Sequence, residues 1–164
     1  MKYSIIVLLP ILISCSDQGA IPSLPQPTDA ELLTLARSSG PWVFYRNSAD
    51  TLLKAIGSAH DEPRLRTRYN AKAATQLDAA GKVRINPNFP DSSLIVKELF
   101  TGTTITTYAI ILKLRSAVNA GNGWVWSETD AAGIVKISAS SKGAGCIACH
   151  SMGLDNTRMN DTHP

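Results

Sequence analysis

The segment ITTYAIILKLR, residues 105–115, decides the fold. Its β-branched and aliphatic side chains predict the clearest β-strand of the chain. Two apolar segments follow it, WVWSE at 124–128 and IVKIS at 134–138, and the intervening TDAAG predicts the turn of a β-hairpin. Short connections of this kind join antiparallel strands, because parallel neighbours need a longer crossover.

The sequence before this segment predicts two more strands and two helices. RLRTRYN at 64–70 alternates in polarity and LIVKELF at 94–100 begins with aliphatic residues, so both are predicted strands. Thr28 is a capping residue for a helix expected at 29–38, and a second short helix is expected to end at Gly81. The prediction is therefore an α+β fold, a mainly antiparallel β-sheet of about five strands with short helices.

The motif CIACH, residues 146–150, follows these strands near the end of the sequence. C-x-x-C-H is the attachment sequence of haem c. Two thiols form thioether bonds with the porphyrin, and the adjacent imidazole becomes an axial ligand of the iron. The motif therefore predicts haem c as the cofactor, bound through Cys146 and Cys149, with His150 as the metal ligand. We expect a C-terminal helix or turn to carry it.

Three other interpretations of the motif were weighed. A structural zinc site needs four ligands, and the other histidines, His60 and His163, are far away in the sequence. A thioredoxin-like dithiol would follow a βαβ pattern, which this sequence lacks. The third interpretation is a chance spacing. The haem interpretation explains both the cysteine spacing and the adjacent histidine, and we favour it.

The N-terminus predicts export. MKYSIIVLLPILISC has a basic Lys2, an apolar stretch too short to cross a bilayer, and a cysteine at the end of that stretch. The pattern is typical of a lipoprotein, with residues 1–14 as signal peptide and Cys15 as the lipidated residue; an ordinary cleaved signal is the alternative. We expect the protein to be lipid-anchored on the periplasmic side of a bacterial membrane. Export agrees with haem c, which bacteria attach outside the cytoplasm.

The remaining sequence is organised simply. Residues 15–28 are rich in Pro and Ser and predict a flexible tether, and residues 29–164 form one domain. The formal net charge is only +3, and the basic residues form no cluster. Nucleic acid is therefore not an expected partner.

Several stretches together resemble the cytochrome P-460 and cytochrome c′-beta family: RLRTRYN, NFPDSSLIVKELF, YAIILK, GWVWSETD and CIACH. The resemblance covers about residues 62–164. It implies an antiparallel sheet that holds haem c, a five-coordinate iron that binds nitric oxide or carbon monoxide, a redox partner protein and a homodimer. Arg66 and Tyr69 match family positions, which implies contact with the haem propionates or the distal pocket; a solvated strand face is the alternative.

One branch of this family oxidises hydroxylamine and carries a covalent bond between a lysine and the porphyrin. The resemblance places that lysine near Asp78–Ala80, where this sequence has none, and Lys72 and Lys82 are the nearest lysines. Binding of nitric oxide, or its redox processing, is therefore the favoured function, and hydroxylamine oxidation is an alternative. A further alternative is a six-coordinate electron carrier whose sixth ligand is Met159, His60 or His163.

Other side chains have expectations of their own. Trp124 and Trp126 share one sheet face by the period of two and are expected in the core or in the haem wall. Lys97 and Glu98 are expected at a solvated edge, and His60 in a surface loop. Core packing, or a cap over the distal face of the haem, is expected for three aromatic side chains: Phe44, Tyr45 and Phe89.

Overall fold

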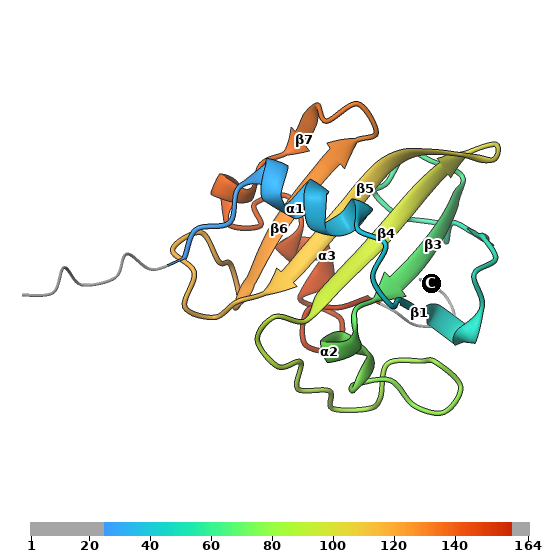
Figure 1. Cartoon of the computed structure of the whole chain (residues 1–164), viewed down its shortest axis with the longest axis horizontal. Coiled ribbons are helices and arrows are strands. Elements are labelled where there is room, and N and C mark those ends of the chain that lie inside the picture. Colours follow the sequence, from blue (N-terminus) through green and yellow to red (C-terminus); the bar gives the residue numbers. More distant parts are fainter. Residues whose placement is uncertain (1–24, 159–164) are drawn as a thin grey trace, which may run out of the picture.

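The computed structural model describes residues 25–158 and shows one antiparallel sheet beside a few short helices (Figure 1). The sheet has seven strands in the order β1-β3-β4-β5-β6-β7, and β2 also pairs with β3. The strands are β1 (Val43–Phe44), β2 (Leu52–Leu53), β3 (Arg64–Tyr69), β4 (Leu94–Thr101), β5 (Thr104–Lys113), β6 (Trp124–Asp130) and β7 (Val135–Ile137). The predicted α+β class and antiparallel pairing are confirmed.

Strands β1 and β2 are the two that the sequence analysis missed. Each has two residues, which is too short for an alternating pattern to be recognised. Both exist only by pairing with β3, where Val43 lies opposite Tyr69 and Leu52 lies opposite Leu65. The five predicted strands are all present.

The helices are short. They are α1 (Asp29–Arg37), α2 (Ala71–Ala74) and α3 (Ile147–His150), with 3-10 turns η1 (Tyr45–Asn47) and η2 (Ala139–Ser141). Thr28 and Glu31 form the expected capping box before α1. The expectation that the second helix reaches Gly81 was wrong. The Asp78 carboxylate instead accepts hydrogen bonds from the backbone of Ala80 and Lys82, which closes a turn there.

Each face of the sheet has its own core. Helix α1 covers one face, where Leu32 packs with Val96 and Val125. Helix α3 lies on the other face, which carries Trp124 and Trp126 in one cluster (Figure 1). The expectation that both tryptophans share a face is confirmed. Because strand residues alternate between faces, this second face is the one on which the CIACH motif lies.

Lys97 and Glu98 are not at a solvated edge, so that expectation was wrong. They lie on β4, which has neighbours on both sides, and they are 8 % and 2 % exposed. Glu98 points to the α1 face and accepts from Arg66 Nε at 2.6 Å and Arg68 Nη2 at 3.0 Å. Arg68 also donates to the backbone carbonyl of Ala36 in α1.

Several expectations concern residues outside the described range of 25–158. They are the signal peptide, the lipidated Cys15, most of the tether, Met159 and His163. Within the described range, no helix is long and apolar enough to cross a membrane.

Candidate haem c site

A tight backbone path brings the CIACH motif against the sheet. Gly143 precedes the motif with φ of 77°, and its carbonyl accepts from the backbone N–H of Cys146 and Ile147 at 2.9 and 3.0 Å. A Cβ on Gly143 would lie 2.6 Å from Cδ1 of Trp126. Only glycine fits this approach, so the motif rests directly on β6.

The two thiols of the motif are free and partly exposed. Cys146 and Cys149 form no disulfide. Burial raises the pKa of the Cys146 thiol to about 11, with smaller contributions from the charges of Glu128 and Cys149. A redox-active dithiol needs the opposite, a thiol whose pKa is lowered. The site therefore disfavours the dithiol interpretation and leaves both sulfurs available for thioether bonds.

The His150 ring is oriented by a backbone carbonyl. Its Nδ1 lies 3.0 Å from the carbonyl oxygen of Asn156, which can only accept, so Nδ1 carries the proton. The ring also packs edge-on against Trp126, with centroids 5.1 Å apart. Burial lowers the pKa of His150 to about 4, so the ring is neutral near pH 7. Nε2 therefore presents a lone pair, the state that binds a metal.

The Asn156 carbonyl is itself held by contacts of its neighbour Asp155. The Asp155 carboxylate pairs with Lys113 Nζ at 2.6 Å and accepts from the Phe89 N–H at 3.2 Å. Its carbonyl accepts from Trp124 Nε1 at 2.9 Å. These contacts fasten the segment that follows the motif to β5, β6 and the loop before β4.

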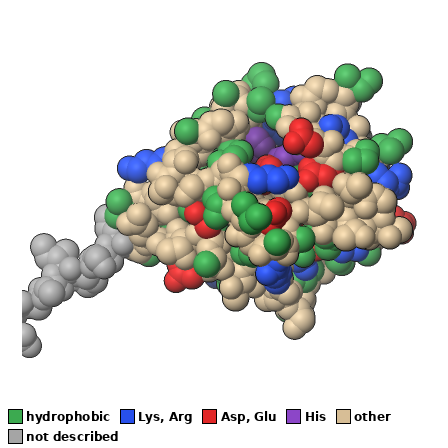
Figure 2. Space-filling view, turned by 90° about the horizontal axis from the view of Figure 1, so that it is seen from above, with side chains coloured by type: hydrophobic (Ala, Val, Ile, Leu, Met, Phe, Trp, Pro, Cys, Tyr) green, Lys and Arg blue, Asp and Glu red, His purple; other side chains and the backbone are tan. Residues whose placement is uncertain are grey.

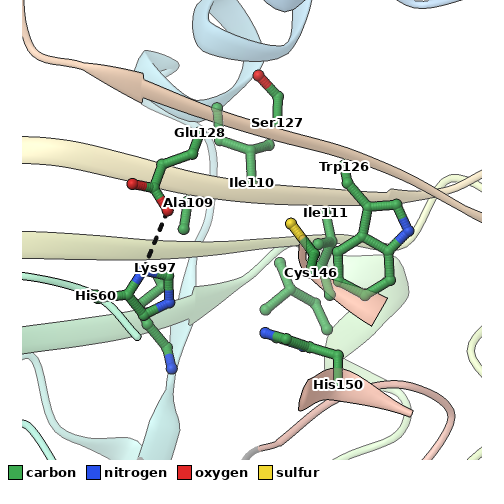
Figure 3. A pocket seen from close by; sticks show the side chains of 11 residues that line it. His60, Lys97, Ala109, Ile110, Ile111, Trp126, Ser127, Glu128, Cys146 and His150 are labelled. Atoms are coloured by element: carbon green, nitrogen blue, oxygen red, sulfur yellow. Dashed lines mark hydrogen bonds and ion pairs between the residues drawn. The ribbon is translucent and has the colours of Figure 1, made fainter. Parts of the chain in front are cut away.

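A hollow lies beside His150, between α3 and the sheet (Figures 2 and 3). Its inner and outer parts contain about 420 and 700 Å³ of empty space, including space open to solvent. Both parts share five lining residues: His60, Lys97, Glu128, Cys146 and His150.

Cross-strand register builds the sheet wall of the hollow. One row of paired residues, Ile95, Ile111 and Trp126, is apolar. The next row runs from Lys97 on β4 through Ala109 on β5 to Glu128 on β6. Directly paired residues share a face, so the two rows give the wall an apolar half and a polar half.

The polar half faces the His150 ring across the hollow (Figure 3). His60 Nδ1 lies 3.1 Å from Glu128 Oε2, and both side chains are mostly buried. His60 was expected in a surface loop; it lies in a loop, but it lines the hollow. Burial lowers the pKa of Lys97 to about 8, and the charge of Arg158 adds to this effect.

Arg66 and Tyr69, which the resemblance suggested, lie in different places. Arg66 is on the α1 face of the sheet, paired with Glu98 and stacked over Phe44, and so is not beside the motif. Tyr69 is fully buried in the core cluster that contains Trp126. Its hydroxyl has no hydrogen-bond partner within residues 25–158, and burial raises its pKa.

The remaining candidates are placed by burial. Tyr45 and Phe89 are core residues, and Phe89 packs edge-on against Trp124. Neither Lys72 nor Lys82 lines the hollow; the lysine that does is Lys97. Sequence reasoning did not identify Lys97, Glu128 or Asp155 as residues of the site. Only the strand register shows that Lys97 and Glu128 lie on the same wall of the hollow.

No family model matches the chain, and no curated protein matches it. Within the described part of the chain, no three side chains of His, Cys, Asp or Glu gather into a metal site. A zinc site made from protein side chains alone therefore has no support there. A haem iron needs only one of these side chains, since the porphyrin itself supplies four nitrogen ligands.

Proposed function

We propose that the protein is an exported, lipid-anchored monohaem c-type cytochrome that binds or redox-processes a small ligand such as nitric oxide. Haem c is attached to Cys146 and Cys149, and His150 is its protein ligand. The observation that carries the proposal is the His150 ring, whose Nδ1 is engaged by Asn156 so that Nε2 is left for the metal. In this proposal Cys15 carries the lipid anchor on the periplasmic side of the membrane.

The residues beside the motif fit such a group. Both thiols are unbonded and partly exposed. The wall of Ile95, Ile111 and Trp126 is apolar, as a porphyrin face requires. Bound haem c would supply a redox-active iron that could take up a small ligand.

Among residues 25–158, the side chains near His150 favour an iron with a free coordination position. Met152 follows His150 by two residues and is 73 % exposed, so it points away from the hollow. His60 lines the hollow, but its Nδ1 is engaged by Glu128. His60 is nevertheless the described side chain that best supports the six-coordinate electron carrier, which remains the second candidate.

The test is the absorption spectrum of the full-length protein matured in a host that attaches haem c. We expect covalent haem on a gel stained for haem, and a high-spin reduced spectrum that shifts with nitric oxide. His150→Ala should retain the thioether-bound haem and lose the proximal ligand. A low-spin reduced spectrum that becomes high-spin in His60→Ala would instead establish the electron carrier. Absence of haem would reject both.

A redox partner protein and a homodimer complete the proposal. The partner would exchange electrons with the haem. Size-exclusion chromatography with light scattering tests the dimer, and a monomer at all concentrations would reject it.

A further inference from the structure

The amine of Lys97 is the unusual group of the hollow. Lys97 lies in the middle of the central strand β4, is 8 % exposed and lines both parts of the hollow. Lysine is almost never this buried unless it is paired. Within residues 25–158, none of the hydrogen bonds or ion pairs found for lysine amines involves Lys97. Its Nζ is also not among the fully enclosed atoms that lack a partner, so the amine reaches the open space of the hollow.

The neighbouring charges do not compensate Lys97. The nearest carboxylate of the hollow, on Glu128, lies two strands away, with Ala109 between them. Adjacent strands are about 4.8 Å apart, so the two backbones are roughly 10 Å apart. Glu128 is also engaged by His60. The charge of Arg158, which lines the outer hollow, opposes protonation of Lys97.

We propose that Lys97 binds a small anionic ligand in the hollow beside His150, and so lets the site take anions such as nitrite or azide as well as nitric oxide. This inference rests on the proposed function and names the ligand class of the same site. In this proposal, the ligand is the hydrogen-bonding partner of the Lys97 ammonium group.

The chemistry of the wall explains why Lys97 strengthens the binding of anions. An ammonium group has three N–H donors and no acceptor, so it pairs best with an anionic oxygen or nitrogen. Ile95, Ala109 and Ile111 offer no competing polar group and lower the local dielectric, which strengthens that hydrogen bond. Carbon monoxide carries no net charge and accepts hydrogen bonds weakly, so its binding gains little from Lys97.

The test compares equilibrium affinities of the full-length, haem-loaded protein for azide, nitrite and carbon monoxide, followed by absorption. Lys97→Met should weaken azide and nitrite binding by about tenfold or more, because a hydrogen bond to a charged group is lost. Carbon monoxide affinity should stay nearly unchanged. Lys142→Met is the matched control, since it removes one lysine charge from an exposed position. Should Lys97→Met not fold, Lys97→Gln makes the same comparison.

Each outcome has one meaning. Anion binding that weakens only in the Lys97 variants supports the proposal. Equal losses for anions and carbon monoxide would overturn it, since they indicate a disturbed pocket. Unchanged anion affinity with a shifted reduction potential would also overturn it, and would mean that the amine serves a porphyrin carboxylate. Covalent haem, confirmed by staining in every variant, keeps a failure of this inference separate from a failure of the proposed function.

Discussion

Lys113 Nζ lies 2.6 Å from Asp155 Oδ1, and this mostly buried ion pair joins β5 to the residue that precedes Asn156. The Asn156 carbonyl is the group that orients His150. The proximal ligand is therefore held in place from the centre of the sheet as well as from its own helix.

Loss of this ion pair should destabilise the fold. Lys113→Met leaves the Asp155 carboxylate without its counter-ion, at a cost of about 3–5 kcal/mol if the charge stays buried. Lys113→Met combined with Asp155→Asn should recover part of this loss, because the second change removes the unpaired charge. Urea unfolding of the haem-free protein measures both. A double variant less stable than Lys113→Met would contradict the assignment.

The same variant should also alter the iron site. Release of the Asn156 carbonyl weakens the hydrogen bond from His150 Nδ1 and makes the imidazole a poorer electron donor. We expect the reduction potential of the haem-loaded Lys113→Met protein to rise. Asp91→Asn is the control, since it removes the exposed ion pair with Arg115, leaves the hydrogen bond from Arg115 to the Phe89 carbonyl in place, and should leave the potential unchanged.

Gly143→Ala should be more damaging than an ordinary glycine substitution. Both Gly143 and Gly102 have positive φ, but only Gly143 would place its Cβ against Trp126; Gly102 has open space around it. We expect Gly143→Ala to cost about 1–3 kcal/mol more than Gly102→Ala, because the added methyl group overpacks the motif against the sheet. Thermal unfolding of the two variants measures the difference, and equal losses would contradict it.

The stability of the haem-free protein should rise with pH in an alkaline window. Burial lowers the pKa of Lys97 to about 8 from the ordinary value of 10.5, and Arg158 acts in the same direction. Between these two values the unfolded chain binds more protons than the folded one, so unfolding becomes less favourable as pH rises. Burial lowers the pKa of His150, which also lines the hollow, to about 4, well below this window.

The contribution of Lys97 across this window is on the order of 3 kcal/mol, since one pKa unit corresponds to about 1.4 kcal/mol. The Cys146 thiol, whose pKa burial raises to about 11, opposes this gain above about pH 9, so comparison with Lys97→Met isolates the contribution of Lys97. Lys97→Met should be more stable than the wild type below pH 8 and should lack this alkaline rise. Denaturant unfolding at pH 7.5 and pH 10 measures both effects. If the free energy of unfolding depended on pH identically in the two proteins, the prediction would be wrong, because folding would then not lower the pKa of Lys97.

Arg66→Ala should leave the haem unaffected. Arg66 is on the α1 face with Glu98, and Arg68 still pairs with that carboxylate when Arg66 is removed. We expect a small loss of stability, about 1 kcal/mol, with unchanged absorption and reduction potential. A shifted potential would support the propionate contact that the family resemblance implied.

The fold was largely predictable because its strands carry local signals. The strands from Arg64 onward alternate or are strongly β-branched, and short turns between them allow only antiparallel pairing. Strands β1 and β2 were not predictable, since two residues have no periodicity and form only against β3. The predicted second helix was longer than the observed one, because helix propensity does not account for the turn that the Asp78 side chain closes.

The candidate site was predictable only where its residues are adjacent in sequence. CIACH is one continuous motif, whereas the polar half of the hollow comes from residues 60, 97 and 128. An alternating pattern does not say which face of the sheet the motif will occupy. Lys97 was therefore expected to face solvent and Arg66 to lie beside the haem. The strand register instead places Lys97 on the face that carries the motif and Arg66 on the α1 face.

Ala109 stands between Lys97 and Glu128 in the polar row, and its side chain is a single methyl group. The depth of the hollow at this point depends on that methyl group. A larger residue there would narrow the space and leave every polar contact in place. In the proposed site, Ala109 on β5 limits the size of the ligand and Lys97 on β4 determines the charge that the ligand prefers. Substitutions on these two strands could then adjust the two properties separately.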